Sequence, residues 1–261
     1  RAPRAARALF SAFDLILAQD AQSWTRLREL GARVAGELDL KQAAAPLPHS
    51  EAELKVLQDE ICGRPVVVAA STHPGEEEQV VAAFKALPQP RPLLVIAPRH
   101  PARGKDVADM LRAQGLKLAR RSIGERILGD TEIYLADTLG ELGLFFRLAQ
   151  VVLMGGGFGE GVGGHNPLEP ARLGLPVVTG PDVANFRETY AGLIHAHAAV
   201  MTPHQAALNA ARAGLLANPD RAAAMGERAR AHAAARHDAA KIALEALRPL
   251  LPPGAGRKGK R

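Results

Sequence analysis

Polar and charged side chains follow five predicted strands, at the point where each strand ends. These loops read STHPGE (71–76), PRHP (98–101), DTLGE (137–141), GGGFGEGVGGHNPLEP (155–170) and GP (180–181). The carboxyl ends of parallel strands meet at one edge of a sheet, where such proteins bind their ligands. One loop of this kind is an ordinary turn, but five at the same edge predict a single functional crevice.

The fourth loop is rich in glycine, with seven glycines between positions 155 and 164. Glycine lets backbone N–H groups approach a phosphate without a clash from Cβ. The helix expected from Pro167 adds free N–H groups and the positive end of a dipole. The loop matches neither GxxxxGK[ST] nor a GxGxxG that opens a βαβ unit. The sequence therefore favours an anion site that belongs to neither a nucleoside triphosphatase nor a dinucleotide enzyme.

Four side chains in these loops suit an anion or a sugar. Arg99 follows a strand directly and keeps its charge, so it is a phosphate or carboxylate clamp unless it forms a surface ion pair. Glu169, in the first helical turn after the glycines, could accept hydrogen bonds from a ribose diol or only favour the helix dipole. His73 and His100 precede prolines and could donate to an anion, although a structural hydrogen bond is the commoner role of a single histidine.

Several other chemistries find no support in the sequence. The single cysteine, Cys62, excludes an internal disulfide and a cysteine-based zinc site. His195 and His197 lie two positions apart on a predicted helix and do not share a face, so no metal site is expected. No Gly-x-Ser-x-Gly element indicates a hydrolase triad. We expect neither a metal nor a cofactor.

Short apolar runs alternate with Ala/Leu-rich helical patterns, and these elements must position the loops. Runs such as VVVAA and LLVIA are typical of parallel strands that are covered on both faces. The alternation predicts an α/β fold, a Rossmann-like doubly wound parallel sheet, with a helical C-terminal tail from about Asp220 to Leu250. The predicted strands are Asp14–Ala18, Val66–Ala70, Leu93–Ala97, Glu132–Ala136, Val151–Met154 and Pro176–Thr179. Four helices predicted before the tail are Ser23–Leu30, Glu76–Leu87, Lys105–Gln114 and Glu141–Ala149. A further helix is capped by Ser50 and reaches about Ile61, and another begins at about Pro167.

The segment AAAPLPH (43–49) is typical of an interdomain linker. The roughly 45 residues before it are too few for an independent core. We therefore expect residues 1–45 to be the end of an N-terminal domain plus the linker, and residues 46–261 to be the ligand-binding domain with its C-terminal helices. The alternative is that residues 1–45 form the first unit of one sheet. The chain begins with Arg, which suggests a fragment or a processed product.

The charge of the chain lies at its ends. With 47% hydrophobic and 23% charged residues, the composition is that of a folded soluble protein and excludes a disordered one. Seven basic residues and no acid lie in residues 1–7 and 257–261, so the net charge of +6 leaves residues 8–256 at about −1. Basic tails of this kind are solvated or contact anionic membranes, and the neutral body does not suit nucleic acid. No apolar run approaches the roughly 20 residues of a spanning helix, and no signal peptide is visible.

Five strings together resemble the 3-deoxy-D-manno-octulosonic acid (Kdo) transferase family. They are STHPGEEE (71–78), PRHP (98–101), DTLGELGLFFRLA (137–149), GGHNPLEPA (163–171) and GP…NF (180–186). The resemblance implies a GT-B glycosyltransferase of two Rossmann-like domains. In that family the C-terminal domain binds the donor CMP-Kdo, whereas the N-terminal domain binds the lipid A precursor and carries the catalytic carboxylate base. This chain would then hold the donor half and only the end of the acceptor half.

The resemblance also implies which residues bind the donor. Arg99 and His100 would lie at the CMP phosphate. The nucleotide would be lined by Leu139, Gly140 and Glu141. The ribose and phosphate would be held by Asn166, Pro167, Leu168 and Glu169, next to Gly163 and Gly164. Further candidates are Ser71, His73, Gly75 and Glu76. No catalytic base is expected in this chain, because the family carries it in the N-terminal domain.

We therefore expect the donor-binding part of an enzyme that transfers Kdo from CMP-Kdo to a lipid A precursor in lipopolysaccharide biosynthesis. It would act at the cytoplasmic face of the bacterial inner membrane and be inactive without its N-terminal domain. The alternatives are a GT-B domain for another nucleotide sugar and a non-catalytic nucleotide-binding module. Two departures from the family matter. Glu37-Leu38-Asp39 replaces the usual Asn-Leu-Lys, which disfavours transfer of an anionic sugar, and Glu160-Gly161-Val162 replaces a Val-Pro-His-like string.

Overall fold

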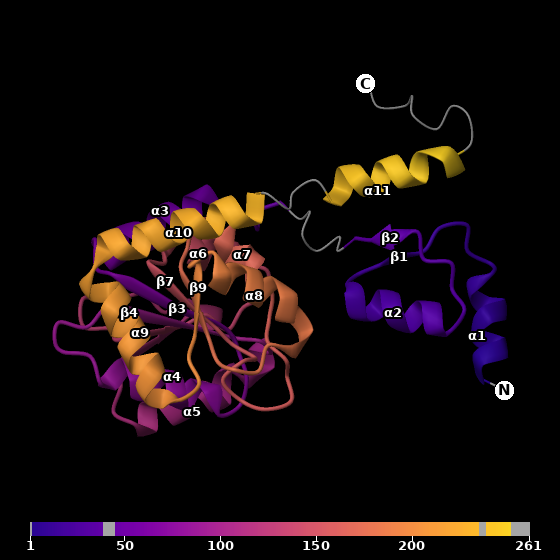
Figure 1. Ribbon diagram of the computed structural model, residues 1–261. Helices are drawn as coiled ribbons and strands as arrows, with labels where there is room; N and C mark the ends of the chain where they lie inside the picture. Colours follow the sequence, from indigo (N-terminus) through magenta and orange to yellow (C-terminus); the bar gives the residue numbers. More distant parts are fainter. Residues whose placement is uncertain (1, 39–44, 235–238, 252–261) are drawn as a thin grey trace. The chain divides into compact units, whose positions relative to one another are not determined.

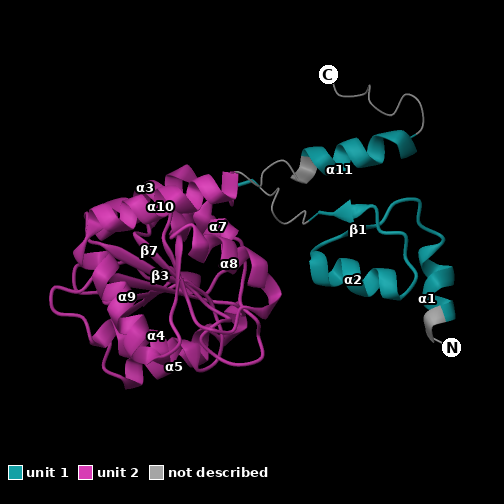
Figure 2. Ribbon diagram, in the orientation of Figure 1, with its two compact units in different colours: residues 1–45, 235–261 teal, residues 46–234 magenta. Residues whose placement is uncertain are grey.

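The computed structural model describes residues 2–38, 45–234 and 239–251. Contacts divide the chain into two compact units, residues 1–45 with 235–261 and residues 46–234 (Figure 2). The larger unit carries all five of the polar loops, and we call it the main unit.

A parallel sheet of seven strands forms the centre of the main unit, in the order β5-β6-β4-β3-β7-β8-β9 (Figure 1). Its strands are β3 (Val66–Thr72), β4 (Leu93–Pro98), β5 (Leu118–Arg120), β6 (Ile133–Leu135), β7 (Val151–Met154), β8 (Val177–Thr179) and β9 (Ala199–Met201). Its helices are α3 (Glu51–Ile61), α4 (Glu76–Lys85), α5 (Gly104–Ala113), α6 (Leu142–Leu148), α7 (Leu168–Ala171), α8 (Arg187–His195), α9 (Gln205–Ala217) and α10 (Pro219–Ala234). The strand order reverses on either side of β3, as in a doubly wound fold, which confirms the predicted fold class.

Each face of the sheet has its own apolar core. Val66, Val68 and Ala70 point to one face, and the intervening Val67 and Ala69 to the other. This alternation follows from the two-residue period of a strand. Because helices cover both faces, every position of the run is apolar. The sequence run VVVAA therefore reflects burial on two sides.

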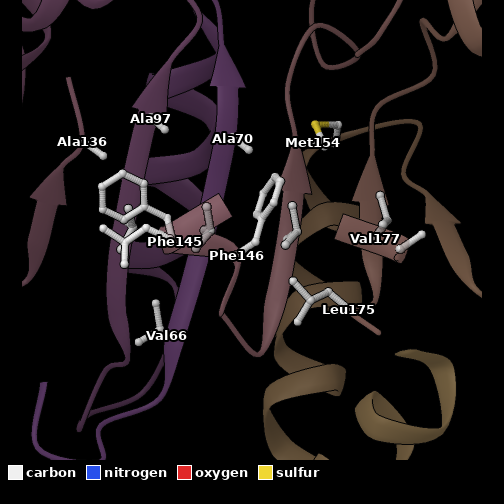
Figure 3. Close-up of a cluster of buried hydrophobic side chains, with 14 of the residues drawn as sticks. Val66, Ala70, Ala97, Ala136, Phe145, Phe146, Met154, Leu175 and Val177 are labelled. Carbon is white, nitrogen blue, oxygen red and sulfur yellow. The ribbon is translucent and has the colours of Figure 1, made fainter. Parts of the chain in front are cut away.

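Helix α6 supplies two large aromatic side chains to the first core. Figure 3 shows Phe145 and Phe146 directed at the strands, among Val66, Ala70 and Met154. Both phenylalanines are almost completely buried, and burial of each contributes about 1.5–3 kcal/mol. This packing fixes α6, and with it the DTLGE loop that precedes it. Helices α4, α5 and α9 cover the opposite face.

Strands β5 and β9 were not predicted from the sequence. Each has only three residues and lies at an edge of the sheet. Strand β5 reads LAR, with one fully buried position, Ala119, so it lacks the apolar run that marks the central strands. The five predicted strands between residues 66 and 179 are present: β7 has the predicted ends, and the other four differ from the prediction by one or two residues.

Helix α3 begins as expected, since the Ser50 hydroxyl accepts the Glu53 N–H at 3.3 Å. The Glu53 carboxylate accepts a hydrogen bond from Arg121 Nη2 at 2.8 Å. Serine at this position satisfies a backbone donor that the helix leaves free. Helix α3 thus gains a second anchor, from Glu53 to the segment after β5.

The smaller unit contains a short parallel pair, β1 (Leu17–Ala18) with β2 (Gly36–Glu37). It also contains α1 (Ala2–Phe10), α2 (Ala21–Glu29) and α11 (Ala239–Leu247). Asp20 caps α2 by accepting the Ser23 N–H at 2.6 Å.

Glu37 is exposed on β2, whereas Asp39 lies outside the described residues. The predicted tail is helical over α10 and α11, and residues 235–238 between them lie outside the description. No helix in the described part of the chain has the length and apolar character needed to cross a bilayer.

Candidate functional site

The carboxyl edge of the sheet brings the polar loops together. All strand pairs of the main unit are parallel, so the loops after β3, β4, β6, β7 and β8 leave the sheet on the same side. Strands β3 and β4 are neighbours, and so are β3 and β7. The STHPGE, PRHP and glycine-rich loops therefore adjoin one another.

A buried carboxylate organises the glycine-rich loop. Glu76 is only 1% exposed. Its Oε2 accepts the N–H groups of His73 at 2.9 Å and Gly156 at 2.8 Å, and its Oε1 accepts that of Phe158 at 2.9 Å. Backbone donors compensate a buried carboxylate charge effectively. The structure thus assigns Glu76 to holding the loops after β3 and β7 together.

Most N–H groups of the glycine-rich loop are already bonded within the protein. Besides those held by Glu76, the N–H groups of Gly161 and Gly163 donate to the Asp182 carboxylate at 2.9 and 3.0 Å. The N–H of Gly164 donates to Gly156 O at 2.8 Å. The expectation that these glycines open their N–H groups to a phosphate is therefore wrong for these positions. Two of these glycines instead adopt positive φ angles that other residues rarely adopt, +84° at Gly163 and +77° at Gly164.

Three histidines meet at this edge. The Nε2 atoms of His73 and His165 lie 2.8 Å apart, and their rings stack with centroids 5.1 Å apart. His100 packs edge-on against His73, with ring centroids 5.8 Å apart. Burial, together with the nearby His73 and Arg99, lowers the pKa of His165 to about 4. Burial also lowers the pKa of His73, although Glu76 opposes this. We call these three residues the histidine cluster; at neutral pH its stacked pair is uncharged.

A small pocket of about 110 Å³ opens beside Arg99, between the ends of β3, β4 and β6. Ser71, Thr138, Leu139 and Gly140 also line it. Ser71 has a φ of 57°, in the left-handed region that non-glycine residues rarely adopt. Leu139 is 77% exposed, so a large apolar side chain faces water at the pocket. The pocket combines a fixed cation, hydroxyl groups and an apolar surface, which suits a ligand with both charge and a flat ring.

Glu141 lies beside this pocket, but its carboxylate is engaged. Arg121 donates to it from Nη2 at 2.6 Å and from Nε at 3.2 Å, and the Thr138 hydroxyl also donates to it. The hydrogen bond from Arg121 lowers the pKa of Glu141. The carboxylate therefore fixes the DTLGE loop. Leu139 and Gly140 of this loop line the pocket.

The segment Asn166–Glu169 turns from the glycine-rich loop into α7. Asn166 Oδ1 accepts the N–H of Leu168 at 3.1 Å, and Pro167 precedes the first residue of the helix. Burial raises the pKa of Glu169, whereas Arg172, Asn166 and Arg99 each favour its charged form. Arg99 thus acts electrostatically on both Glu169 and His165. The predicted residues from PRHP and from GGHNPLEP belong to one neighbourhood.

No group of three histidine, cysteine, aspartate or glutamate side chains suited to a metal ion occurs among the described residues.

None of the known protein-family models matches the chain. The chain is 36% identical over 253 residues to the 3-deoxy-D-manno-octulosonic acid transferase of Bordetella pertussis. The matched segment covers 94% of this chain and 58% of that relative. It also resembles the crystal structure of the C-terminal CMP-Kdo binding domain of WaaA from Acinetobacter baumannii. That match has 31% identity and a TM-score of 0.64, and it covers 69% of this chain and 96% of the other. The chain belongs to the Kdo transferase family.

The Kdo transferase of Haemophilus influenzae is 40% identical over 133 residues, which is 50% of this chain and 31% of the relative. This chain thus spans little more than half the length of the curated Kdo transferases that it matches. WaaG, a glycosyltransferase of lipopolysaccharide biosynthesis, is 14% identical with a TM-score of 0.53 over 88% of the chain. That likeness shows the fold alone.

Two residues of this Kdo transferase site were not selected from the sequence. His165 stands inside the GGHNPLEP string, yet its partner His73 lies 92 positions away. Asp182 accepts hydrogen bonds from the N–H groups of Gly161 and Gly163, and its only local signal is that it is an acid three residues after β8 ends at Thr179. Gly75, one of the further candidates for donor binding, is the N-cap of α4 with a φ of +88°. The turn into that helix requires this left-handed conformation, which favours glycine.

Proposed function

We propose that the domain that begins at Pro46 is the donor-binding domain of a glycosyltransferase and that its donor is CMP-Kdo. The observation that carries the proposal is the meeting of two loops at the carboxyl edge of the sheet: His100, next to Arg99, packs against His73, and His73 contacts His165 in the loop that leads to Glu169. A cation for a phosphate and a carboxylate for a ribose are the two groups that a nucleotide sugar needs. The likeness to the Acinetobacter domain, which is described as CMP-Kdo binding, supports this choice of donor.

In this proposal each polar loop has one task. Arg99 and His100 bind the phosphate that links CMP to the sugar, and Ser71 lines the same pocket. Leu139 and Gly140 lie against the nucleotide, with Glu141 holding their loop. Glu169, positioned by the Asn166 turn, accepts from the ribose hydroxyls, and Gly163 and Gly164 shape the approach. Arg99 stabilises the charge that develops on the leaving phosphate when the sugar is transferred.

The acceptor is proposed to be a lipid A precursor, which makes the reaction a step of lipopolysaccharide biosynthesis. The acceptor surface and the catalytic base would belong to the part of such enzymes that this chain does not span. We place the protein at the cytoplasmic face of the inner membrane, with its basic ends on anionic lipid. Arg4 and Arg7 of α1 are exposed, which supports such contact, whereas Arg1 and residues 257–261 lie outside the described residues.

Competition among nucleotides tests the donor. Calorimetric titration with CMP, UMP and cytidine should give the highest affinity for CMP. Loss of the phosphate in cytidine should weaken binding at least tenfold, because a charge-assisted hydrogen bond contributes about 1.5–3 kcal/mol. Tighter binding of UMP would indicate a GT-B domain for another nucleotide sugar. A folded chain without affinity for any nucleotide would contradict the proposal.

A further inference from the structure

The stacked pair of the histidine cluster has room for one additional proton. With the two Nε2 atoms 2.8 Å apart, a single hydrogen lies between His73 and His165. One ring donates it and the other accepts it, and each ring keeps one more nitrogen, Nδ1. Because burial lowers the pKa of both histidines, both rings are neutral at pH 7. A proton added to Nδ1 of the donating ring leaves this hydrogen bond in place and makes it charge-assisted. A second proton would put hydrogen on both Nε2 atoms and break the contact.

The protein itself offers little negative charge to hold that proton. Glu76, on α4, faces His73 but already accepts three backbone N–H groups. Glu77, on the same helix, is bonded to Thr72 and to Arg103, with Arg103 Nη1 at 2.8 Å. Both carboxylates are therefore compensated before any proton reaches the histidines.

The remaining groups around the pair oppose a positive charge. Arg99 and His100 follow β4, Arg103 follows them, and all three act against protonation of the pair. From α8, the neutral Tyr190 hydroxyl donates to the carbonyl of His165 at 3.0 Å. An anion placed beside Arg99 would reverse this balance, since it neutralises the arginine and adds a negative charge of its own.

We infer that the histidine cluster takes up a proton when the phosphate of a nucleotide binds beside Arg99, so that nucleotide binding is linked to proton uptake. The inference rests on the proposed function and adds to it a role for His73 and His165 as positioning residues of the phosphate site. By linkage, affinity for the phosphate ligand rises as the pH falls through the pKa that the pair has in the complex. It stops rising below the pKa of the free pair.

Calorimetry of CMP binding at pH 7.0, in two buffers with different heats of ionisation, measures the protons taken up. We expect an uptake of up to one proton per CMP, reduced by at least half in His73→Gln and in His165→Gln. His195→Gln is the control, because His195 is exposed at the end of α8. The CMP phosphate has its own second pKa near 6, but its contribution is the same in all variants. Cytidine, which lacks the phosphate, should cause no uptake.

The pH profile gives an independent readout. Between pH 8 and pH 6 the affinity of the unchanged protein should rise more than that of His165→Gln, and each unit of pKa shift that falls inside this range adds up to about tenfold. Binding of CMP without proton uptake, or with an uptake in both cluster variants that equals that of the unchanged protein, would overturn the inference and leave the proposed function standing. Failure of CMP to bind the folded protein would overturn both. Circular dichroism of each variant shows whether the fold is kept.

Discussion

The carboxylate of Glu76, in the first turn of α4, accepts the N–H of Gly156, the second residue after β7, at 2.8 Å. A Cβ on the preceding residue, Gly155, would lie 2.5 Å from the carbonyl oxygen of Ser71. The two loops thus approach too closely for any side chain larger than hydrogen at that point. A buried charge and a missing side chain together join the end of β3 to the end of β7.

Replacement of Glu76 by glutamine should therefore loosen the site. The amide would turn an NH2 group toward buried N–H donors and leave at least one of them unsatisfied. We expect a loss of about 1–3 kcal/mol in the free energy of unfolding, together with weaker binding of CMP. Urea denaturation measures the first and calorimetry the second. Glu78→Gln, on the exposed side of the same helical turn, is the control, and equal behaviour of the two variants would contradict this role of Glu76.

Glu169 should show opposite effects on stability and on binding. Burial raises its pKa in the folded protein, so the folded state binds more protons than the unfolded state between the unfolded pKa, about 4.3, and the raised value. Stability therefore falls as the pH rises through that window and stays lower above it. Glu169→Gln removes the penalty, and the ligand-free variant should be more stable than the parent at pH 7.

The same substitution should weaken CMP binding by about 1–3 kcal/mol, because an amide is a poorer acceptor for ribose hydroxyls. Denaturation at pH 7 and at pH 4 checks the stability effect, which should vanish at the lower pH, where Glu169 is protonated. Glu188→Gln changes an exposed carboxylate in the first turn of α8 and serves as the control. Unchanged CMP affinity in Glu169→Gln would remove Glu169 from the site.

The fold was predictable where burial leaves a continuous pattern. Strands β3, β4 and β7 are apolar at nearly every position because helices cover both faces, and VVVAA or LLVIA shows this directly. Strand β5, with its three residues ending in Arg120, carries no such pattern and was missed. The position of Arg99 and His100 at the carboxyl edge of the sheet was predictable because both directly follow β4.

Other parts of the site depend on contacts that no local pattern encodes. Three glutamates stand in a row at the start of α4, and only the structure shows that Glu76 and Glu77 are buried while Glu78 is exposed. The pairing of His73 with His165 joins loops that are far apart in the chain. Glu141 was expected to line the nucleotide, but its side chain is held by Arg121, whose approach from the segment after β5 could not be foreseen.

Arg99 should discriminate between ligands with and without a phosphate. If its guanidinium binds the donor phosphate, Arg99→Ala should weaken CMP binding about tenfold or more, the effect of losing a charge-assisted hydrogen bond. Cytidine binding should change little. Arg112→Ala, which removes an exposed arginine from α5, is the control. An equal loss for CMP and cytidine would mean that Arg99 acts through packing or folding.

The basic ends should govern membrane binding. Each basic residue near an anionic surface contributes about 1 kcal/mol at low salt, and residues 8–256 carry almost no net charge. Binding to vesicles that contain phosphatidylglycerol should therefore require residues 1–7 and 257–261 and disappear at high salt. Sedimentation of vesicles with the full chain and with a trimmed chain measures this. Binding that survives trimming, or that ignores salt, would contradict the prediction.

This chain should bind the donor without transferring its sugar. The residues proposed to hold CMP-Kdo lie between Ser71 and Glu169, inside the main unit, so donor binding needs no further part of the protein. Transfer needs more. An acceptor hydroxyl must lose its proton to a base, and the acceptor must be held close to the sugar. Both tasks are proposed to belong to the part of Kdo transferases that this chain does not span.

Loss of the base removes about 10²–10⁴-fold in rate, and loss of acceptor positioning removes roughly 7 kcal/mol or more of the barrier reduction. The two losses together make turnover by the isolated chain undetectable beside an intact enzyme. The assay combines the purified chain with CMP-Kdo and a lipid A precursor, alongside a CMP titration that proves the donor site is folded. Turnover at the rate of an intact enzyme would place the base within this chain.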